Sequence, residues 1–178
     1  ALIFSAVEDR RSLNAEVVSL PNKDGKVELP AMLAELARRG VTVVRLTLHV
    51  GPGTFKPVTS RDPSQHRLDP EAYVLPPETA AAIAQARRRG GKVWAVGTTV
   101  TRTLEMRAGE RGTVQAGAGW ASLFIRPGHT FRVVDHLLTN FHLPQSTLLM
   151  LVCAFGGKEQ VMTAYQHAIQ EQYSFYYH

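Results

Sequence analysis

Residues 41–50 read VTVVRLTLHV, and Gly51, Pro52 and Gly53 follow them directly. The stretch is mostly apolar and rich in β-branched side chains, a composition that favours a strand covered on both faces. The glycine-proline-glycine sequence indicates a turn, because these residues end regular structure. We therefore predict a buried strand that leaves the sheet at residue 51.

Helices and further strands are predicted on either side of this strand. Apolar residues recur at helical spacing over 30–39 before Gly40, and residues 78–89 are rich in alanine and arginine, which are good helix formers. A second apolar strand is predicted over 92–96, and the polar, proline-punctuated residues 59–72 indicate a surface excursion.

Strands and helices also alternate in the C-terminal half. Its sequence predicts a strand over 120–126, an extended segment over 131–138, and helices over 148–155 and 159–172. Ser146 or Thr147 can cap the first of these helices. Alternating helices and apolar strands indicate an α/β fold, a layered α/β/α domain with a largely parallel sheet. Residues 1–30 show no persistent period, so we assign the α/β domain to residues 31–178.

Composition sets the broad class of the protein. The 178 residues can bury the core of one compact domain. Lys and Arg number 20 against 15 Asp and Glu, a net charge of +5 that suits a polyanionic partner without requiring one. The apolar runs are too short for a membrane span, and the single Cys153 has no disulfide partner. We therefore expect a soluble, cytoplasmic protein without a membrane partner.

Ligands of open α/β sheets bind beyond the carboxyl ends of the strands, and the first predicted loop there follows residue 48. His49 could carry protons and Lys56 offers a cation, while Gly51 and Gly53 allow close backbone approach to a ligand. The alternative is a tight strand exit with a packed histidine.

The second loop opens the helix that follows residues 92–96. The N–H groups of Gly97, Thr98 and Thr99 could bind an anion, Arg102 adds a charge, and Glu105 could accept hydrogen bonds from ribose hydroxyls. The alternative is a threonine cap with an intrahelical pair between Arg102 and Glu105.

The third loop, residues 138–147, has the sequence LTNFHLPQST. Thr139, Asn140 and His142 surround Phe141, so polar side chains could pair with a base that stacks on the ring. The alternative is an elaborate helix cap in which Phe141 is a hydrophobic staple.

The sequence argues against several other site chemistries. The histidine pairs do not have helical metal-ligand spacing, so we expect no metal site. Dinucleotide and P-loop fingerprints are absent from the sequence, as is the nucleophile motif G-x-S-x-G.

Four motifs occur together in order: LTLHVGPGTFKPV (residues 46–58), AVGTTVTRTLE (95–105), LFIRPG (123–128) and VDHLLTNFHLPQSTLLMLVCAFGG (134–157). Together they closely resemble the S-adenosylmethionine:tRNA ribosyltransferase-isomerase family of queuosine biosynthesis. The resemblance implies a large α/β domain into which the family inserts a small β-barrel. This chain is too short to contain the barrel, so we expect it to be part of a longer enzyme.

The resemblance also implies a reaction and its partners. S-adenosylmethionine is the co-substrate, and its ribosyl part moves to 7-aminomethyl-7-deazaguanine at the wobble position of tRNA. Epoxyqueuosine-tRNA forms, and adenine and methionine are released. The alternative is a non-catalytic module of the family that binds tRNA or adenosylmethionine; a generic nucleotide-binding domain is a third possibility. The sequence does not give the oligomeric state.

Site roles follow from the resemblance by position. The H-x-M-H-x-E motif of the family is matched at His66 and Glu71, with Asp69 at the second histidine. The predicted catalytic residues are His49, His142 and Glu71. The predicted cofactor-binding residues are Gly51, Gly53, Gly97, Thr98, Thr99, Arg102 and Glu105. The predicted substrate-binding residues are Thr139, Asn140, Phe141, Lys56 and His66.

Overall fold

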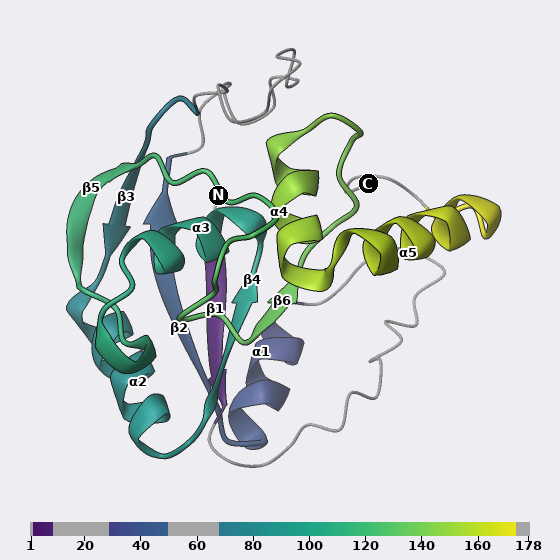
Figure 1. Cartoon of the computed structure of the whole chain (residues 1–178). Coiled ribbons are helices and arrows are strands. Elements are labelled where there is room, and N and C mark those ends of the chain that lie inside the picture. Colours follow the sequence, from purple (N-terminus) through teal and green to yellow (C-terminus); the bar gives the residue numbers. More distant parts are fainter. Residues whose placement is uncertain (1, 9–28, 50–67, 174–178) are drawn as a thin grey trace.

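A computed structural model describes residues 2–8, 29–49 and 68–173 of the chain (Figure 1). Helices and strands alternate along most of it. The strands are β1 (Leu2–Glu8), β2 (Val41–Leu48), β3 (Glu71–Leu75), β4 (Lys92–Val96), β5 (Gly117–Ala121) and β6 (His136–Leu138). The helices are α1 (Leu29–Arg38), α2 (Pro77–Arg88), α3 (Thr98–Met106), the short 3-10 helix η3 (Glu110–Gly112), α4 (Thr147–Gly156) and α5 (Lys158–Gln170).

The six strands form one sheet in the order β5-β3-β2-β1-β4-β6. Strand β1 pairs antiparallel with both β2 and β4, and β3 pairs antiparallel with both β2 and β5. The pair β4–β6 is parallel. The layered α/β fold is therefore confirmed, whereas the prediction of a largely parallel sheet is wrong.

Strands β1 and β3 explain this difference. The four strands that the sequence indicated, β2, β4, β5 and β6, all run in the same direction through these pairings. Strand β1 lies between β2 and β4, and β3 lies between β5 and β2, each running the opposite way. Neither was predicted: β1 falls in the segment without a period, and β3 begins at Glu71, inside the polar excursion assigned to residues 59–72.

Because β2, β4 and β6 run in the same direction, their carboxyl ends lie at one edge of the sheet. We call it the carboxyl edge; it carries His49, Gly97 and Thr139, the residues that follow these three strands. Glu71 belongs to the same edge, because β3 runs the other way and begins there. The opposite edge is where β4 and β6 begin, at Lys92 and His136.

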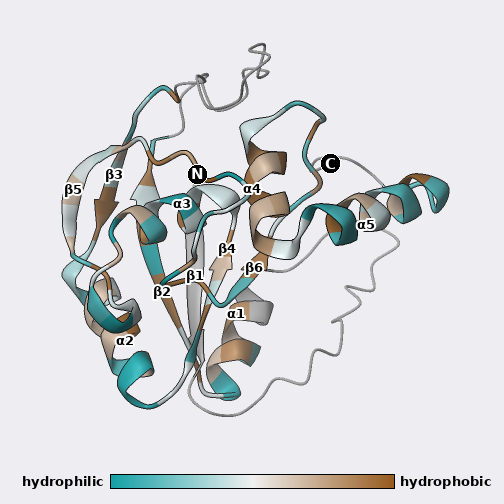
Figure 2. Ribbon diagram, in the orientation of Figure 1, coloured by the Kyte–Doolittle hydropathy of each residue, from teal (hydrophilic) through white to brown (hydrophobic). Residues whose placement is uncertain are grey.

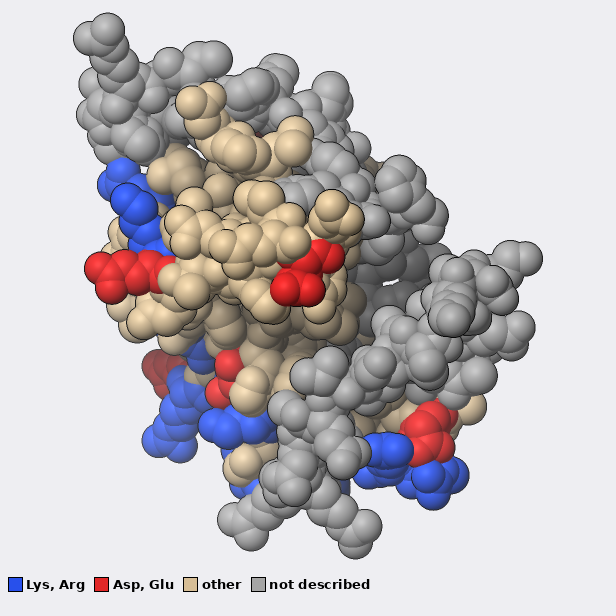
Figure 3. Space-filling view, turned by 90° about the vertical axis from the view of Figure 1, so that its right-hand side faces the viewer, with Lys and Arg blue, Asp and Glu red and all other residues tan. Residues whose placement is uncertain are grey.

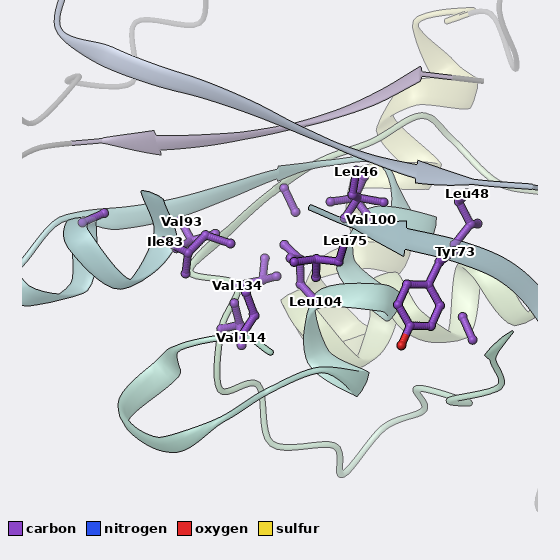
Figure 4. Packing of buried hydrophobic residues seen from close by; sticks show 14 residues of the cluster. Leu46, Leu48, Tyr73, Leu75, Ile83, Val93, Val100, Leu104, Val114 and Val134 are labelled. Atoms are coloured by element: carbon purple, nitrogen blue, oxygen red, sulfur yellow. The ribbon is translucent and has the colours of Figure 1, made fainter. Parts of the chain in front are cut away.

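The core lies between the sheet and helices α2 and α3. Alternate residues of the strands, such as Leu46 and Val93, meet Ile83 of α2 and Leu104 of α3 in one buried cluster. Figure 4 shows these side chains gathered in a single layer beside the strands. Burying this apolar surface is the main stabilising contribution to the fold.

The helices largely match the predictions, whereas the last strands are shorter than predicted. Strand β5 ends at Ala121, so residues 122–126 lie outside it, and only 136–138 of the extended segment 131–138 pair as a strand. Ser146 caps α4 as predicted, since its side chain accepts a hydrogen bond from the Leu149 N–H.

Helices α4 and α5 stand beside the sheet, and α5 projects from the body of the molecule (Figure 1). Helix α4 is the most apolar of the described α-helices, and brown dominates much of its length in Figure 2. On the side from which α5 projects, the described surface consists mostly of uncharged residues, and Lys and Arg gather near its margins (Figure 3). Among the described helices, none is long and apolar enough to cross a membrane.

Candidate functional site at the carboxyl edge

Two backbone hydrogen bonds tie the predicted loops to their neighbours at the carboxyl edge. The N–H of His49 donates to the carbonyl of Ala72, 2.8 Å away, and the N–H of Gly97 donates to the carbonyl of Leu138 at 2.8 Å. The second bond joins the loop after β4 directly to the end of β6. All three predicted loops therefore begin at one edge, although His49 is separated from Gly97 by strand β1.

Helix α3 begins at this edge. Its N-cap is Gly97, at a φ of 101° that side-chain-bearing residues rarely adopt, and the cap makes no side-chain hydrogen bond. Thr98 and Thr99 are the first two residues of the helix, so the alternative in which a threonine caps it is wrong. The N–H groups of the first turn of a helix have no intrahelical acceptor, which leaves them available to an anion.

Glu71 and Arg102 form a buried ion pair between β3 and α3. The Arg102 guanidinium donates through Nη2 to Oε2 of Glu71, and both residues are only 3% exposed. Burial lowers the pKa of Arg102 from its ordinary value. Removing one partner of such a pair would leave a buried charge without compensation, which is energetically costly. The contact therefore holds both side chains in place.

Glu105 lies elsewhere. Its carboxylate accepts hydrogen bonds from the backbone N–H groups of Arg132, Val133 and Val134, at 2.8 to 3.0 Å, just before β6 begins. The structure therefore does not bring Glu105 to the carboxyl edge. The alternative of an intrahelical pair with Arg102 is also wrong, because Arg102 binds Glu71 instead.

The third loop is held by contacts of its own and by helix α5. Oγ1 of Thr139 lies 3.1 Å from Nε2 of His142, within hydrogen-bond distance. The backbone N–H of His142 donates to the Tyr165 hydroxyl at 2.8 Å, and the Phe141 ring meets the Tyr165 ring edge-on with centroids 5.1 Å apart. The ring that was predicted to stack on a base thus has a protein partner on one side. Asn140 lies between these residues and is partly buried.

Burial lowers the pKa of His142 below its ordinary value of 6.5. The neutral imidazole is therefore the dominant form at neutral pH, and one ring nitrogen is able to accept a proton. His49, by contrast, is exposed.

A cavity of about 10 Å³ lies between α3 and α4. Neither His49 nor His142 lines it. Its lining residues are Leu68, Thr98, Arg102, Phe124, Ile125, Thr147, Leu148 and Leu151. A wider surface hollow of about 600 Å³ lies past the C-terminal end of α3, around residues 108–112, and includes none of the predicted site residues.

Sequence reasoning missed Tyr165 and assigned Thr147 only a capping role. Tyr165 gave no signal, because its contact with the third loop spans 23 positions. For Thr147 there was a partial signal, since a hydroxyl residue at the first position of an apolar helix is typical of a helix start.

Four predicted residues, Gly51, Gly53, Lys56 and His66, lie outside the described residues. Within the described ranges, no group of three or more His, Cys, Asp or Glu residues is arranged to hold a metal ion.

The chain is similar to several proteins that share one name. The S-adenosylmethionine:tRNA ribosyltransferase-isomerase of Anaeromyxobacter sp. (strain Fw109-5) is 58% identical over 146 residues, which are 82% of this chain and 42% of that protein. The protein of the same name from Natranaerobius thermophilus is 54% identical over 147 residues, 83% of this chain and 43% of its own length. This chain thus spans less than half the length of these relatives.

A solved structure gives the same result. The crystal structure of S-adenosylmethionine tRNA ribosyltransferase from Thermotoga maritima matches with a TM-score of 0.67 and 40% sequence identity, over 83% of this chain and 46% of that one. A family model described as "Queuosine biosynthesis protein" matches residues 28–178. The chain belongs to the queuosine biosynthesis protein family, as the motifs of its loops indicated.

Proposed function

We propose that this chain carries part of the active site for transfer and isomerisation of the ribosyl group of S-adenosylmethionine. The acceptor is 7-aminomethyl-7-deazaguanine at the wobble position of tRNA, and the products are epoxyqueuosine-tRNA, adenine and methionine. The relatives named for this reaction support the proposal, since the two described above are 58% and 54% identical to the chain over 146 and 147 residues.

One observation carries the proposal: β2, β4 and β6 end at the same edge of the sheet. Residues that are 90 positions apart in the sequence, such as His49 and Thr139, therefore begin loops on one side of the molecule. A reaction that breaks a glycosidic bond and joins two substrates needs proton carriers, anion-binding groups and base-binding groups together. The carboxyl edge supplies all three classes.

His142 is the proton carrier that we favour. Its pKa lies below 6.5, so the imidazole is ready to act as a base, and Thr139 contacts Nε2, which leaves Nδ1 for the substrate. His49 is a second carrier on the exposed side of the same edge. Glu71 acts through Arg102, because its carboxylate is buried and already paired.

The remaining groups bind substrates in this proposal. The first turn of α3, with Gly97, Thr98 and Thr99, faces the methionyl part of adenosylmethionine. Asn140 and Phe141 hold the deazaguanine or the adenine. Gly51, Gly53, Lys56 and His66 complete the set by their place in the family motifs.

Adenine release from adenosylmethionine, measured with precursor-bearing tRNA, tests the proposal. Loss of a general acid or base costs roughly 10²- to 10⁴-fold in rate, so His142→Ala should lower adenine release by at least about a hundredfold. The matched control is His167→Ala, because His167 is a histidine of α5 whose side chain is exposed. Unchanged turnover in a folded His142→Ala protein would remove this residue from the catalytic set.

A second candidate is a binding module without turnover. The small cavity between α3 and α4 favours it, because neither histidine lines that space. This candidate predicts that the chain binds adenosylmethionine or tRNA, as measured by calorimetry, but releases no adenine when both are present.

A further inference from the structure

The first turns of two helices meet at the cavity between α3 and α4. Thr98 is the first residue of α3 and Thr147 the first residue of α4, and both line the cavity. Each helix N-terminus carries free N–H groups and a partial positive charge equivalent to roughly half an elementary charge. Two such ends at one place favour a negatively charged or hydrogen-bond-accepting atom between them.

Two buried polar atoms in this lining lack partners. Nε of Arg102 and Oγ1 of Thr147 make no hydrogen bond in the structure, although the two residues are only 3% and 4% exposed. Buried polar groups almost always have partners, so an orphaned pair at one cavity indicates a place for a ligand atom or a water molecule.

The charges around the cavity and its size limit which ligand group can occupy it. The charge of Arg102 is balanced by Glu71, so the two helix ends supply the remaining positive potential. Apolar side chains, including Leu148 and Leu151, form the rest of the wall and strengthen polar contacts there by excluding water. The volume of about 10 Å³ admits roughly one oxygen-sized atom.

We infer that this cavity binds one carboxylate oxygen of the methionyl part of S-adenosylmethionine, with Thr147 and Arg102 Nε–H as its hydrogen-bond donors. The inference rests on the proposed function, and it adds Thr147 to the binding residues. It also gives the ion pair of Glu71 and Arg102 a role: Glu71 holds the guanidinium by Nη2, and Nε–H stays available to the ligand.

Decarboxylated S-adenosylmethionine is the matched probe, because it keeps the nucleoside, the sulfonium and the amine and lacks only the carboxylate. Calorimetry on the full chain should show that it binds at least about tenfold more weakly than S-adenosylmethionine, as expected for a hydrogen bond to a charged group. In Thr147→Val, which keeps the shape of the side chain, the ratio of the two dissociation constants should fall towards one. Thr163→Val on the exposed face of α5 should keep the wild-type ratio.

Each outcome separates the inference from the function beneath it. If the wild-type protein binds both compounds equally, or if Thr147→Val keeps the wild-type ratio, the carboxylate does not bind here, while adenosylmethionine remains the ligand. A changed melting temperature of Thr147→Val with an unchanged ratio would show that the hydroxyl serves stability alone and would overturn the inference. If neither compound binds the wild-type chain, the proposed function itself fails.

Discussion

The two edges of the sheet differ in the hydrogen-bond partners of their charged side chains. At the opposite edge, Oδ2 of Asp135 accepts a hydrogen bond from the Val93 N–H at 2.7 Å and lies 2.7 Å from Nη1 of Arg87. Glu105 likewise accepts hydrogen bonds from three consecutive backbone N–H groups. There, the protein itself supplies the partners of these carboxylates.

At the carboxyl edge, some buried polar atoms have no hydrogen-bond partner in the protein. Arg102 is paired through one nitrogen, yet its Nε and Oγ1 of Thr147 have no hydrogen-bond partner. The two carboxylates of the opposite edge are thus paired within the protein, whereas two buried polar atoms that line the cavity have no partner. The difference separates groups that stabilise the fold from groups that can bind a ligand, and it can be tested by removing members of each set.

The largest effect on stability is expected at Glu105. Glu105→Ala leaves two buried N–H groups and one part-buried N–H group without an acceptor, so the free energy of unfolding should fall by about 3–5 kcal/mol. Urea unfolding followed by circular dichroism measures this. Glu110→Ala is the control, because Glu110 is exposed and should change stability by less than about 0.5 kcal/mol. A small effect of Glu105→Ala would mean that the opposite edge does not depend on its carboxylate.

A smaller loss is expected at Asp135. Asp135→Asn keeps the shape of the side chain and one acceptor but removes the charge that faces Arg87, so unfolding should become easier by about 1–2 kcal/mol. Lys92→Met is the comparison: Nζ of Lys92 lies 3.5 Å from Oδ1 of Asp135 and its side chain is 58% exposed, so its loss should cost little. Equal effects of the two variants, measured by thermal unfolding, would contradict the importance of the Arg87 contact.

The sequence predicted correctly that the three loops begin at one edge, although the prediction assumed a largely parallel sheet and the sheet is mostly antiparallel. Strands β2, β4 and β6 were predicted from apolar runs, and they do run in the same direction. Strand β1 has the sequence LIFSAVE, which is too short to show a period, and its place between β2 and β4 depends on pairing with residues about 40 and 90 positions away. Strand pairing of this kind is set by tertiary contacts and not by local sequence.

The site was predictable in its loops and not in its contacts. The motifs drew attention to Arg102 and Glu105, one helical turn apart on α3, and predicted related roles for them. In the structure, Arg102 forms an ion pair with Glu71, whereas Glu105 accepts hydrogen bonds from the backbone of residues 132–134. The two side chains therefore belong to opposite edges. Which partner a buried charge finds depends on how distant segments pack, and spacing along one helix cannot reveal it.

Tyr165 links α5 to the carboxyl edge, where its hydroxyl accepts a hydrogen bond from the His142 N–H. Tyr165→Phe removes the acceptor of the His142 N–H but keeps the ring that Phe141 packs against, so stability should fall by only about 1 kcal/mol. The loop that holds His142 should also exchange its amide hydrogens faster, which hydrogen-exchange mass spectrometry can follow. If exchange is unchanged in this loop, Tyr165 does not restrain it.

The smallest effect expected is a pH dependence from His142. Burial lowers the pKa of this imidazole below 6.5 in the folded protein, so the unfolded chain binds more protons than the folded one as the pH falls through that range. The stabilising contribution is present above pH 6.5 and is lost as the pH falls through the lower, folded-state pKa. Thermal unfolding between neutral and mildly acidic pH should therefore show a steeper loss of stability for the wild-type protein than for His142→Gln, which does not titrate. Parallel pH profiles would show that the ring is solvated in the folded protein and that burial does not lower its pKa.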